Sequence, residues 1–342
     1  MELMALDQNF KLIGYLPYLN LQWNRRYYEA GEYTAQIRKQ DYLPGAVYLF
    51  SNERPEVGLV QKTATQSGVK GEFILISGYF AEKLADRNIF HPALTMTGTP
   101  SEIAKKAMTD YAPDGFSISV DETSLGTPTS VEWTGQEVGT ALYEMLQTQE
   151  LSQRVYFDFM TASLKYRLWQ GVDRTQSQNT NPWALFTDES AHVTEFVLTE
   201  DDSQYKNFAV MQYGDSENPS VLEVDMRKSA SEPKRRLFME HYGTDQVLAE
   251  LRQEAKERLQ EYAMIERADI KAVQEGLEYL KDYDLGDKCD VINHQLQKSY
   301  EARLIGVNEV FKQGRHVVSL EFGEKIPTTY NKLNRLVRTM RR

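Results

Sequence analysis

Short stretches of alternating apolar and polar residues, separated by turn signals, recur in distant parts of this chain and constrain its fold most. In residues 33–38 every second side chain is apolar, which places one face of a strand in a core and the other in solvent. Similar stretches fill residues 10–80, with hairpin signals such as Pro44-Gly45 between them. This first part is predicted to form a small antiparallel barrel or sandwich.

Helical signals follow in the middle of the chain. Thr99 is a candidate N-cap before Pro100, and Glu102 lies where the helix dipole favours a negative charge. A second helix is predicted to begin after Gln136, with Val138, Leu142, Met145 and Leu146 on one face. Two strands around a turn are expected in residues 155–169. These signals predict a mixed α and β unit.

Alternation returns from residue 183 to 213, and a long helix is expected at about residues 245–265. Its predicted buried stripe contains Leu248, Leu251, Ala255, Leu259 and Tyr262, and Glu254 lies on its exposed face. Further strands are predicted at 288–292, 301–307 and 316–322, with turns at 306–308 and 313–314. The predicted division is therefore a first β-unit at 1–93, an α/β unit at 94–170, a second β-unit at 171–226 and 283–342, and a helical insertion at 227–282.

Composition excludes several classes of protein. The chain has 342 residues, is 41% hydrophobic and 26% charged, and has no apolar run long enough to span a membrane, so we expect a soluble protein of several packing units. Its N-terminus does not resemble a secretory signal, so synthesis in a cytoplasm is expected. A net charge of −11 argues against a general nucleic-acid-binding surface.

The candidate catalytic and binding residues each have an alternative interpretation. Cys289 and His294 resemble a nucleophile and base, but a small buried Cys289 side chain is favoured. The acidic residues from Glu195 to Asp202 suggest a carboxylate pair for glycoside hydrolysis or a calcium site, but a loop or lumen-facing acidic patch is favoured. The four tryptophans suit stacking on sugar rings, but packing in a core or at a subunit interface is favoured. They are Trp23, Trp133, Trp169 and Trp183.

Three sequence motifs occur in an order that resembles the baseplate hub proteins of long-tailed bacteriophages, and the resemblance covers the chain from Leu12 to Gly323. The first is Trp-Asn-Arg-Arg-Tyr at 23–27, the second Gly-Val-Asp-Arg-Thr at 171–175, and the third Tyr-Asp-Leu-Gly-Asp at 283–287. The structural residues that the resemblance indicates are Trp23, Arg25, Arg26, Tyr27, Gly31, Gly171, Asp173, Arg174, Thr175, Asn181, Pro182, Asn207, Leu285, Gly286, Asp287, Phe322 and Gly323. Gly286 is expected in a turn that other residues avoid.

The resemblance implies an α+β, mainly β fold with two tail-tube-like antiparallel β-barrel units and smaller α/β units. It implies a structural hub without enzymatic activity, in which a homotrimeric ring joins the sixfold tail tube to a threefold spike or fibre. The implied partners are the tube or distal tail protein, the spike or fibre protein and the tape-measure protein. DNA would pass through the ring without specific binding, and the protein would not insert into a membrane.

The implied location is the tail or baseplate of the virion, with the host cytoplasm during assembly. Because the chain stops at Arg342, soon after Gly323, the resemblance implies a hub without a lytic or fibre domain. No catalytic residue, metal or cofactor is expected. We expect the lumen to be acidic, with Glu195 to Asp202 as the candidate segment, and the basic C-terminal residues to face outward. A baseplate cell-wall hydrolase and a carbohydrate-binding receptor protein stay open as alternatives.

Overall fold

The computed structural model describes residues 1–68, 71–113, 118–120, 124–190, 193–242, 248–272, 276–312 and 314–323. The basic C-terminal residues Arg335, Arg338, Arg341 and Arg342 lie outside this part. Strand makes up 49% and helix 14%, so the predicted mainly β fold is confirmed. The chain divides into two compact units: the first contains Met1–Val197 and returns from Asp269, and the second is Leu198–Ala268.

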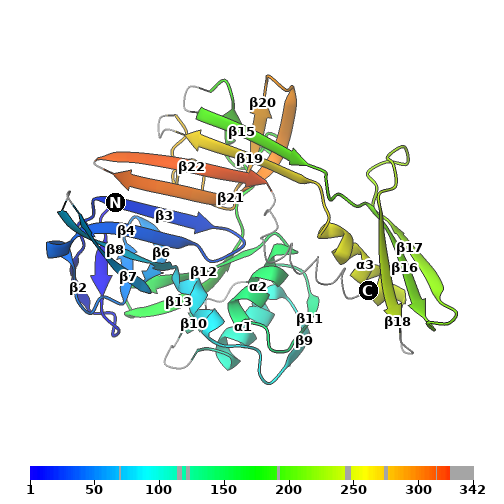
Figure 1. Ribbon diagram of the computed structural model, residues 1–342, viewed down its shortest axis with the longest axis horizontal. Helices are drawn as coiled ribbons and strands as arrows, with labels where there is room; N and C mark the ends of the chain where they lie inside the picture. Colours follow the sequence, from blue (N-terminus) through cyan, green and yellow to red (C-terminus); the bar gives the residue numbers. More distant parts are fainter. Residues whose placement is uncertain are drawn as a thin grey trace. The chain divides into compact units, whose positions relative to one another are not determined.

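One large sheet connects the N-terminal and C-terminal β-rich parts of the first unit (Figure 1). Its strands, in spatial order, are β15 (Val193–Asp201), β19 (Ile265–Ala272), β22 (Arg315–Gly323), β21 (Lys298–Lys312), β3 (Asn20–Arg26), β4 (Glu32–Arg38), β8 (Gly71–Tyr79) and β7 (Lys62–Gly68). The central pair is antiparallel, with Arg26 opposite Gly306 and Asn20 opposite Lys312. The sheet is therefore continuous across both β-rich parts, and its division into two tube-like barrels stays a prediction.

Strand β21 continues through residues 306–308, where the sequence predicted a turn. That prediction was wrong, because Gly306 and its neighbours pair on both sides, with β3 and with β22. The glycine instead coincides with a shift of register between Leu304 and Gly306. A bulge of this kind bends a strand without ending it. At its other end β21 pairs with β20 (Lys288–Asn293), which in turn pairs with β14 (Leu185–Thr187).

A smaller sheet packs against the N-terminal half of the large one. It contains β2 (Leu12–Tyr15), β1 (Met4–Leu6), β5 (Tyr48–Ser51) and β6 (Arg54–Leu59). The two sheets share a core in which the Trp23 ring lies 4.6 Å from the Phe80 ring and 5.6 Å from the Tyr33 ring. The alternation in residues 33–38 has this cause, since Tyr33, Ala35 and Ile37 face the shared core.

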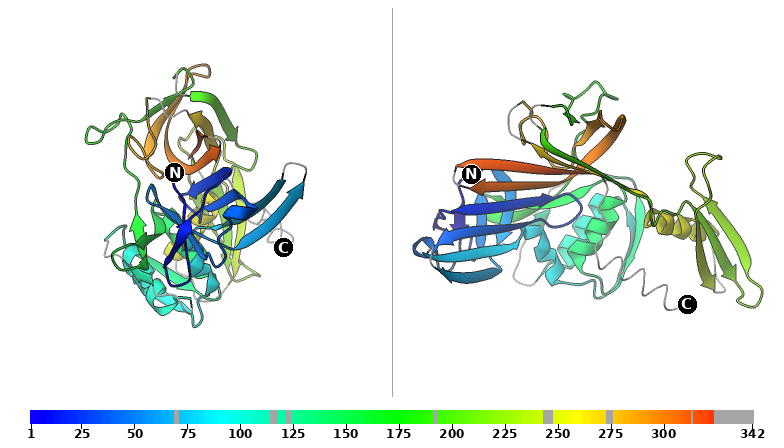
Figure 2. Two further views of the ribbon diagram at one scale, coloured as in Figure 1. Left: turned by 90° about the vertical axis from the view of Figure 1, so that its left-hand side faces the viewer. Right: turned by 45° about the horizontal axis from the view of Figure 1, so that its top comes forward.

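The middle of the chain forms the α/β part that the sequence predicted. Its elements are η2 (Ala81–Arg87), β9 (Leu94–Gly98), α1 (Pro100–Asp110), β10 (Ile118–Val120), β11 (Thr129–Trp133), α2 (Val138–Gln147), β12 (Ser152–Asp158) and β13 (Ser163–Trp169). Thr99 and Glu102 form a capping box that begins α1, and α2 buries its predicted stripe. Helices α1 and α2 lie side by side (Figure 2).

The second unit is a three-stranded sheet covered by one helix. The strands are β17 (Ser220–Asp225), β16 (Phe208–Gly214) and β18 (Arg236–Tyr242), and the helix is α3 (Leu248–Gln260). Leu251, Ala255 and Leu259 are buried against the sheet, as predicted. The prediction for Leu248 was wrong. Leu248 is 46% exposed because it is the first residue of α3 and precedes Leu251, where the buried stripe of the helix begins.

This second unit begins at Leu198, earlier than the helical insertion predicted at 227–282. The physical reason is that α3 needs an apolar surface to cover. Strands β16 and β17 supply it through Met211 and Leu222, although their alternation resembled that of the second β-unit. The other predicted boundaries stay predictions.

Candidate functional site

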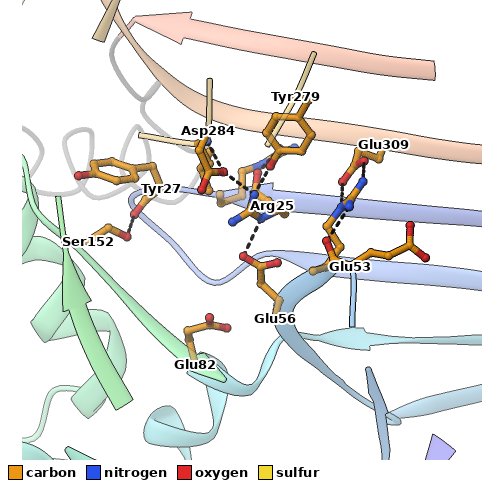
Figure 3. A network of polar contacts seen from close by, with 12 residues as sticks. Arg25, Tyr27, Glu53, Glu56, Glu82, Ser152, Tyr279, Asp284 and Glu309 are labelled. Carbon is orange, nitrogen blue, oxygen red and sulfur yellow. Dashed lines mark hydrogen bonds and ion pairs between the residues drawn. The ribbon is translucent and has the colours of Figure 1, made fainter. Parts of the chain in front are cut away.

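The buried side chain of Arg25 lies where distant segments of the first unit meet (Figure 3). Arg25, on β3, is fully buried, and its Nε donates to Glu56 Oε1 at 2.6 Å. Its Nη1 donates to Asp284 Oδ1 at 2.8 Å and to the Tyr279 hydroxyl. Arg25 therefore ties β3 to β6 and to the segment that precedes β20.

The charged form of Arg25 is favoured despite its burial. Burial acts to lower the pKa of Arg25, but the negative charges of Glu56 and Asp284 and the hydrogen bond to Asp284 outweigh it, and the pKa is raised well above its ordinary value. The guanidinium also lies over the Tyr279 ring, 5.6 Å from its centre. A buried charge with several partners of this kind specifies which segments meet.

Tyr27, two residues further, connects the same place to the α/β part. Its hydroxyl donates to the Glu150 carbonyl at 2.9 Å and accepts from the Gly171 amide at 3.1 Å. Its carbonyl accepts from the Ser152 hydroxyl, as Figure 3 shows. The ring packs edge-on against Trp169 with 5.0 Å between centres. Tyr27 thus contacts both the start of β12 and the end of β13, through its carbonyl and its side chain.

Two glycines allow the second and third motifs to touch. A Cβ on Gly171 would lie 1.8 Å from the Gly286 carbonyl oxygen, and a Cβ on Gly286 would lie 2.2 Å from the Tyr27 ring. Gly286 has φ of 87°, so the turn expected there is present. Asp287 then accepts from the Val172 amide at 2.7 Å and from Arg174 Nε at 2.6 Å. These contacts hold the second and third motifs together, next to Tyr27 of the first motif.

We refer to Arg25, Tyr27, Glu56, Gly171, Arg174, Tyr279, Asp284, Gly286 and Asp287 as the junction. It contains residues of all three sequence motifs, which are widely separated along the chain and adjacent in the fold. The arrangement contains no nucleophile beside a base. It is suited to holding segments in fixed positions.

Other residues indicated by the resemblance support the junction from nearby strands. Arg26 pairs with Glu321 at 3.3 Å, and Phe322 packs on Phe186 with 4.9 Å between ring centres. Leu285 is buried beside the turn at Gly286, and Gly323 ends β22 with φ of 113°. A Cβ on Gly31 would lie 2.3 Å from the Asn24 carbonyl oxygen. Trp23 belongs to the core between the sheets rather than to the junction.

The turn after Gly171 is ordered by its own side chains. Asp173 accepts from the Thr175 amide at 2.9 Å and from its hydroxyl at 2.8 Å, and Asn181 donates to the Asp173 carbonyl at 3.1 Å. Pro182 is exposed in the same loop. Asn207 belongs to the second unit, where it donates to Glu232 at 2.8 Å and accepts from the Arg235 amide at 2.8 Å. Asn207 therefore has no place in the junction.

Sequence reasoning missed several residues of this region. Glu56 and Tyr279 were not singled out, and Asp284 appeared only as a member of the third motif. The pair in which Arg54 Nε donates to Glu309 at 2.7 Å was also missed. His316 Nε2 lies 2.9 Å from the same buried carboxylate. A signal was available at Glu56, because a charged residue beside apolar residues of a strand indicates a buried charge that needs a partner. Nothing local identifies the partners of such a residue.

The other candidate residues are not arranged for catalysis. Cys289 is fully buried, and burial raises the pKa of its thiol far above the ordinary range, as expected of a core side chain. His294 instead lies 3.0 Å from Asp188. Glu195 pairs with Lys271, and Asp202 pairs with Arg235 at 2.6 Å. Within the ranges described above, no three His, Cys, Asp or Glu side chains are grouped to hold a metal ion.

Residues 2–324 match the family model described as siphovirus ReqiPepy6 Gp37-like protein. The chain belongs to this family. The resemblance to tail proteins of long-tailed phages is therefore confirmed. No curated protein sequence matches the chain. Among the residues that the structure describes, no helix combines the length and apolarity needed to cross a membrane.

Solved structures with the same fold cover nearly the whole chain. A tail protein from Neisseria meningitidis MC58 has a TM-score of 0.61 at 13% identity, covering 95% of this chain and 97% of that one. Prophage tail protein gp18 from Listeria monocytogenes EGD-e has a TM-score of 0.59 at 11% identity, with 100% of both chains covered. The 43 kDa tail protein of prophage MuSo2 from Shewanella oneidensis has a TM-score of 0.61 at 12% identity, covering 94% of this chain and 98% of that one. At these identities the likeness concerns the fold.

Proposed function

We propose that the chain is a non-enzymatic structural protein of a phage tail, located in the virion tail or baseplate after assembly in the host cytoplasm. The observation that carries the proposal is that a family of siphovirus proteins and the folds of three tail proteins each cover almost the whole chain. The junction supports a structural role, because its buried charges and glycines hold segments together.

Within the tail we assign the chain to the baseplate hub. Three copies would form a ring that joins the sixfold tail tube or distal tail protein to a threefold spike or fibre. The tape-measure protein would be a further partner. The support is that the three motifs shared with hub proteins come together in the junction. A closed ring needs interfaces in which one surface of each copy contacts a different surface of the next.

The ring would leave a channel through which DNA passes without specific binding. The net charge of −11 supports this, because acidic walls repel phosphate and do not retain DNA through counterion release. The segment from Glu195 to Asp202 stays the candidate for the lumen. Its charge is partly neutralised by the pairs with Lys271 and Arg235.

Imaging of the assembled particle by cryo-electron microscopy tests the hub assignment. We expect three copies of the chain around the tail axis at the tip, below the last tube ring. A dimer, a sixfold ring or a position outside the axis would contradict it. Peptidoglycan zymography and a glycan array address the alternative activities, and we expect both to be negative. Tight, salt-sensitive DNA binding by the purified protein would contradict the channel proposal.

A further inference from the structure

A small cavity adjoins the junction, and several side chains that line it have a buried polar atom with no hydrogen-bond partner among the residues that the structure describes. Five side chains that line it each contribute one such atom: Arg25 Nη2, Glu56 Oε2, Glu82 Oε2, Arg154 Nη2 and Trp169 Nε1. Buried polar atoms are nearly always paired, so a cluster of five requires an explanation. These five side chains come from β3, β6, η2, β12 and β13, which include segments distant along the chain.

The size of the cavity limits what it can hold. It has about 10 Å³ for the centre of a water molecule, which is about the minimum that one water needs. Arg25 is fully buried, and Glu56 and Glu82 are each 5% exposed. A larger ligand would have to displace these side chains.

The polar lining limits the chemistry of the occupant. Two guanidinium groups and an indole offer N–H donors, which oppose a bare cation. Two carboxyl groups offer acceptors, which oppose an anion. A small molecule that both donates and accepts suits this set. Figure 3 shows Glu82 reaching from η2 toward the Glu56 side of the network.

We propose that the cavity is a binding site for one water molecule, which donates to Glu56 and Glu82 and accepts from Trp169 Nε1 and from one of the two guanidinium groups. Such a water would link the β3 and β6 strands to the α/β part, in addition to the direct hydrogen bonds that Tyr27 makes with Glu150 and Ser152. It would be an integral part of the fold, as buried waters with three or four partners are. The inference goes beyond the proposed function and does not depend on it.

The surroundings of Glu82 agree with a hydrated carboxyl group. Its Oε1 accepts from the Val155 amide at 3.1 Å, which leaves Oε2 for the water. Burial raises the pKa of Glu82 to about 7, with a further contribution from the Glu56 charge, while Arg154 acts in the opposite direction. The buried hydroxyls of Tyr143 and Tyr166 also lie close enough to interact with it, and Arg25 lines the same cavity. A nearby water lessens the cost of the charged form.

A crystal structure that resolves ordered water tests the proposal directly. We expect one peak at about 2.7 to 3.2 Å from at least three of the five atoms. A second test uses protein labelled with ¹⁵N-tryptophan, in which the Trp169 indole N–H should show a nuclear Overhauser effect to a bound water. The variant Trp169→Phe assigns its signal. An empty cavity, or no effect at Trp169, would overturn the proposal.

Two variants of one residue form the matched comparison. Glu82→Gln keeps a hydrogen-bonding group of the same size: its oxygen still accepts from the Val155 amide and its Nε2 donates to the water, so we expect the Trp169 effect to persist. Glu82→Met has a similar length without an acceptor, and we expect the effect to fall severalfold. Equal signals in the two variants would show that Glu82 does not bind the water. If Glu82→Met fails to fold, the wild-type protein and Glu82→Gln still decide whether the site is hydrated.

Discussion

Gly171 lies so close to the Gly286 carbonyl that a Cβ on Gly171 would stand 1.8 Å from that oxygen. The contact joins the second sequence motif to the third. Because the obstructing atom belongs to the backbone, no side-chain rotation can relieve the overlap. The close approach therefore depends on glycine at position 171.

Gly171→Ala is expected to destabilise the first unit by about 1 to 3 kcal/mol or more, the usual cost of forcing atoms into a packed site. Urea unfolding followed by tryptophan fluorescence measures the change. Gly14→Ala is the matched control, since a Cβ there would meet only Leu43, at 3.6 Å. Equal effects of the two substitutions would show that the close approach is not important for stability.

Arg25→Met is expected to destabilise by about 3 to 5 kcal/mol, because it leaves the buried Glu56 carboxylate without its cation. Lys39→Met removes a cation of the same unit from an exposed pair with Glu72, whose side chains are 62% and 56% exposed. That control should cost less than about 1 kcal/mol. Chemical denaturation of both variants makes the comparison. A small loss for Arg25→Met would mean that the junction tolerates the unpaired carboxylate.

Stability should fall as pH rises toward and through neutrality because of Glu82. Its pKa is raised from 4.5 to about 7, first by burial and then by the Glu56 charge, so the folded state binds the proton more tightly than the unfolded state. This contribution is fully present below pH 4.5 and is lost as pH rises through about 7. The rise corresponds to about 3 kcal/mol.

Glu82→Gln should remove that slope, since the amide does not titrate. Unfolding free energies at about pH 5 and about pH 8 for the variant and the wild type isolate the Glu82 contribution from that of other carboxyl groups. Glu137→Gln, at an exposed position, serves as the control and should keep the wild-type slope. Parallel pH profiles for wild type and Glu82→Gln would refute the assignment.

Leu251→Ala should destabilise the second unit by about 2 to 5 kcal/mol, because Leu251 is 3% exposed in its core. Leu248→Ala, on the same helix but 46% exposed, should cost about 0.5 kcal/mol or less. Amide hydrogen exchange in β16 and β18 reports on this unit separately from the first. Replacing Glu254, which pairs with His241 at 2.8 Å on the exposed face, should also have little effect.

Local signals in the sequence determined much of the secondary structure. The capping residues Thr99 and Glu102 act within one turn, so they predicted the start of α1 without knowledge of the rest of the fold. Alternation predicted β4 because successive side chains of a strand point to opposite faces of the sheet, and one face of β4 is buried. The same reasoning went wrong at Leu248, because periodicity identifies a helix stripe and does not show how far toward the end of the helix that stripe is buried.

The motifs and the order in which they occur came from the sequence alone. Their convergence was decided by the tertiary structure, through the antiparallel pairing of β3 with β21 and the close approach of Gly171 to Gly286. The partners of Arg25 were decided in the same way. The physical reason is that hydrogen bonds and ion pairs act over a few ångströms, so strand register and chain crossing, and not local sequence, choose which distant residues meet.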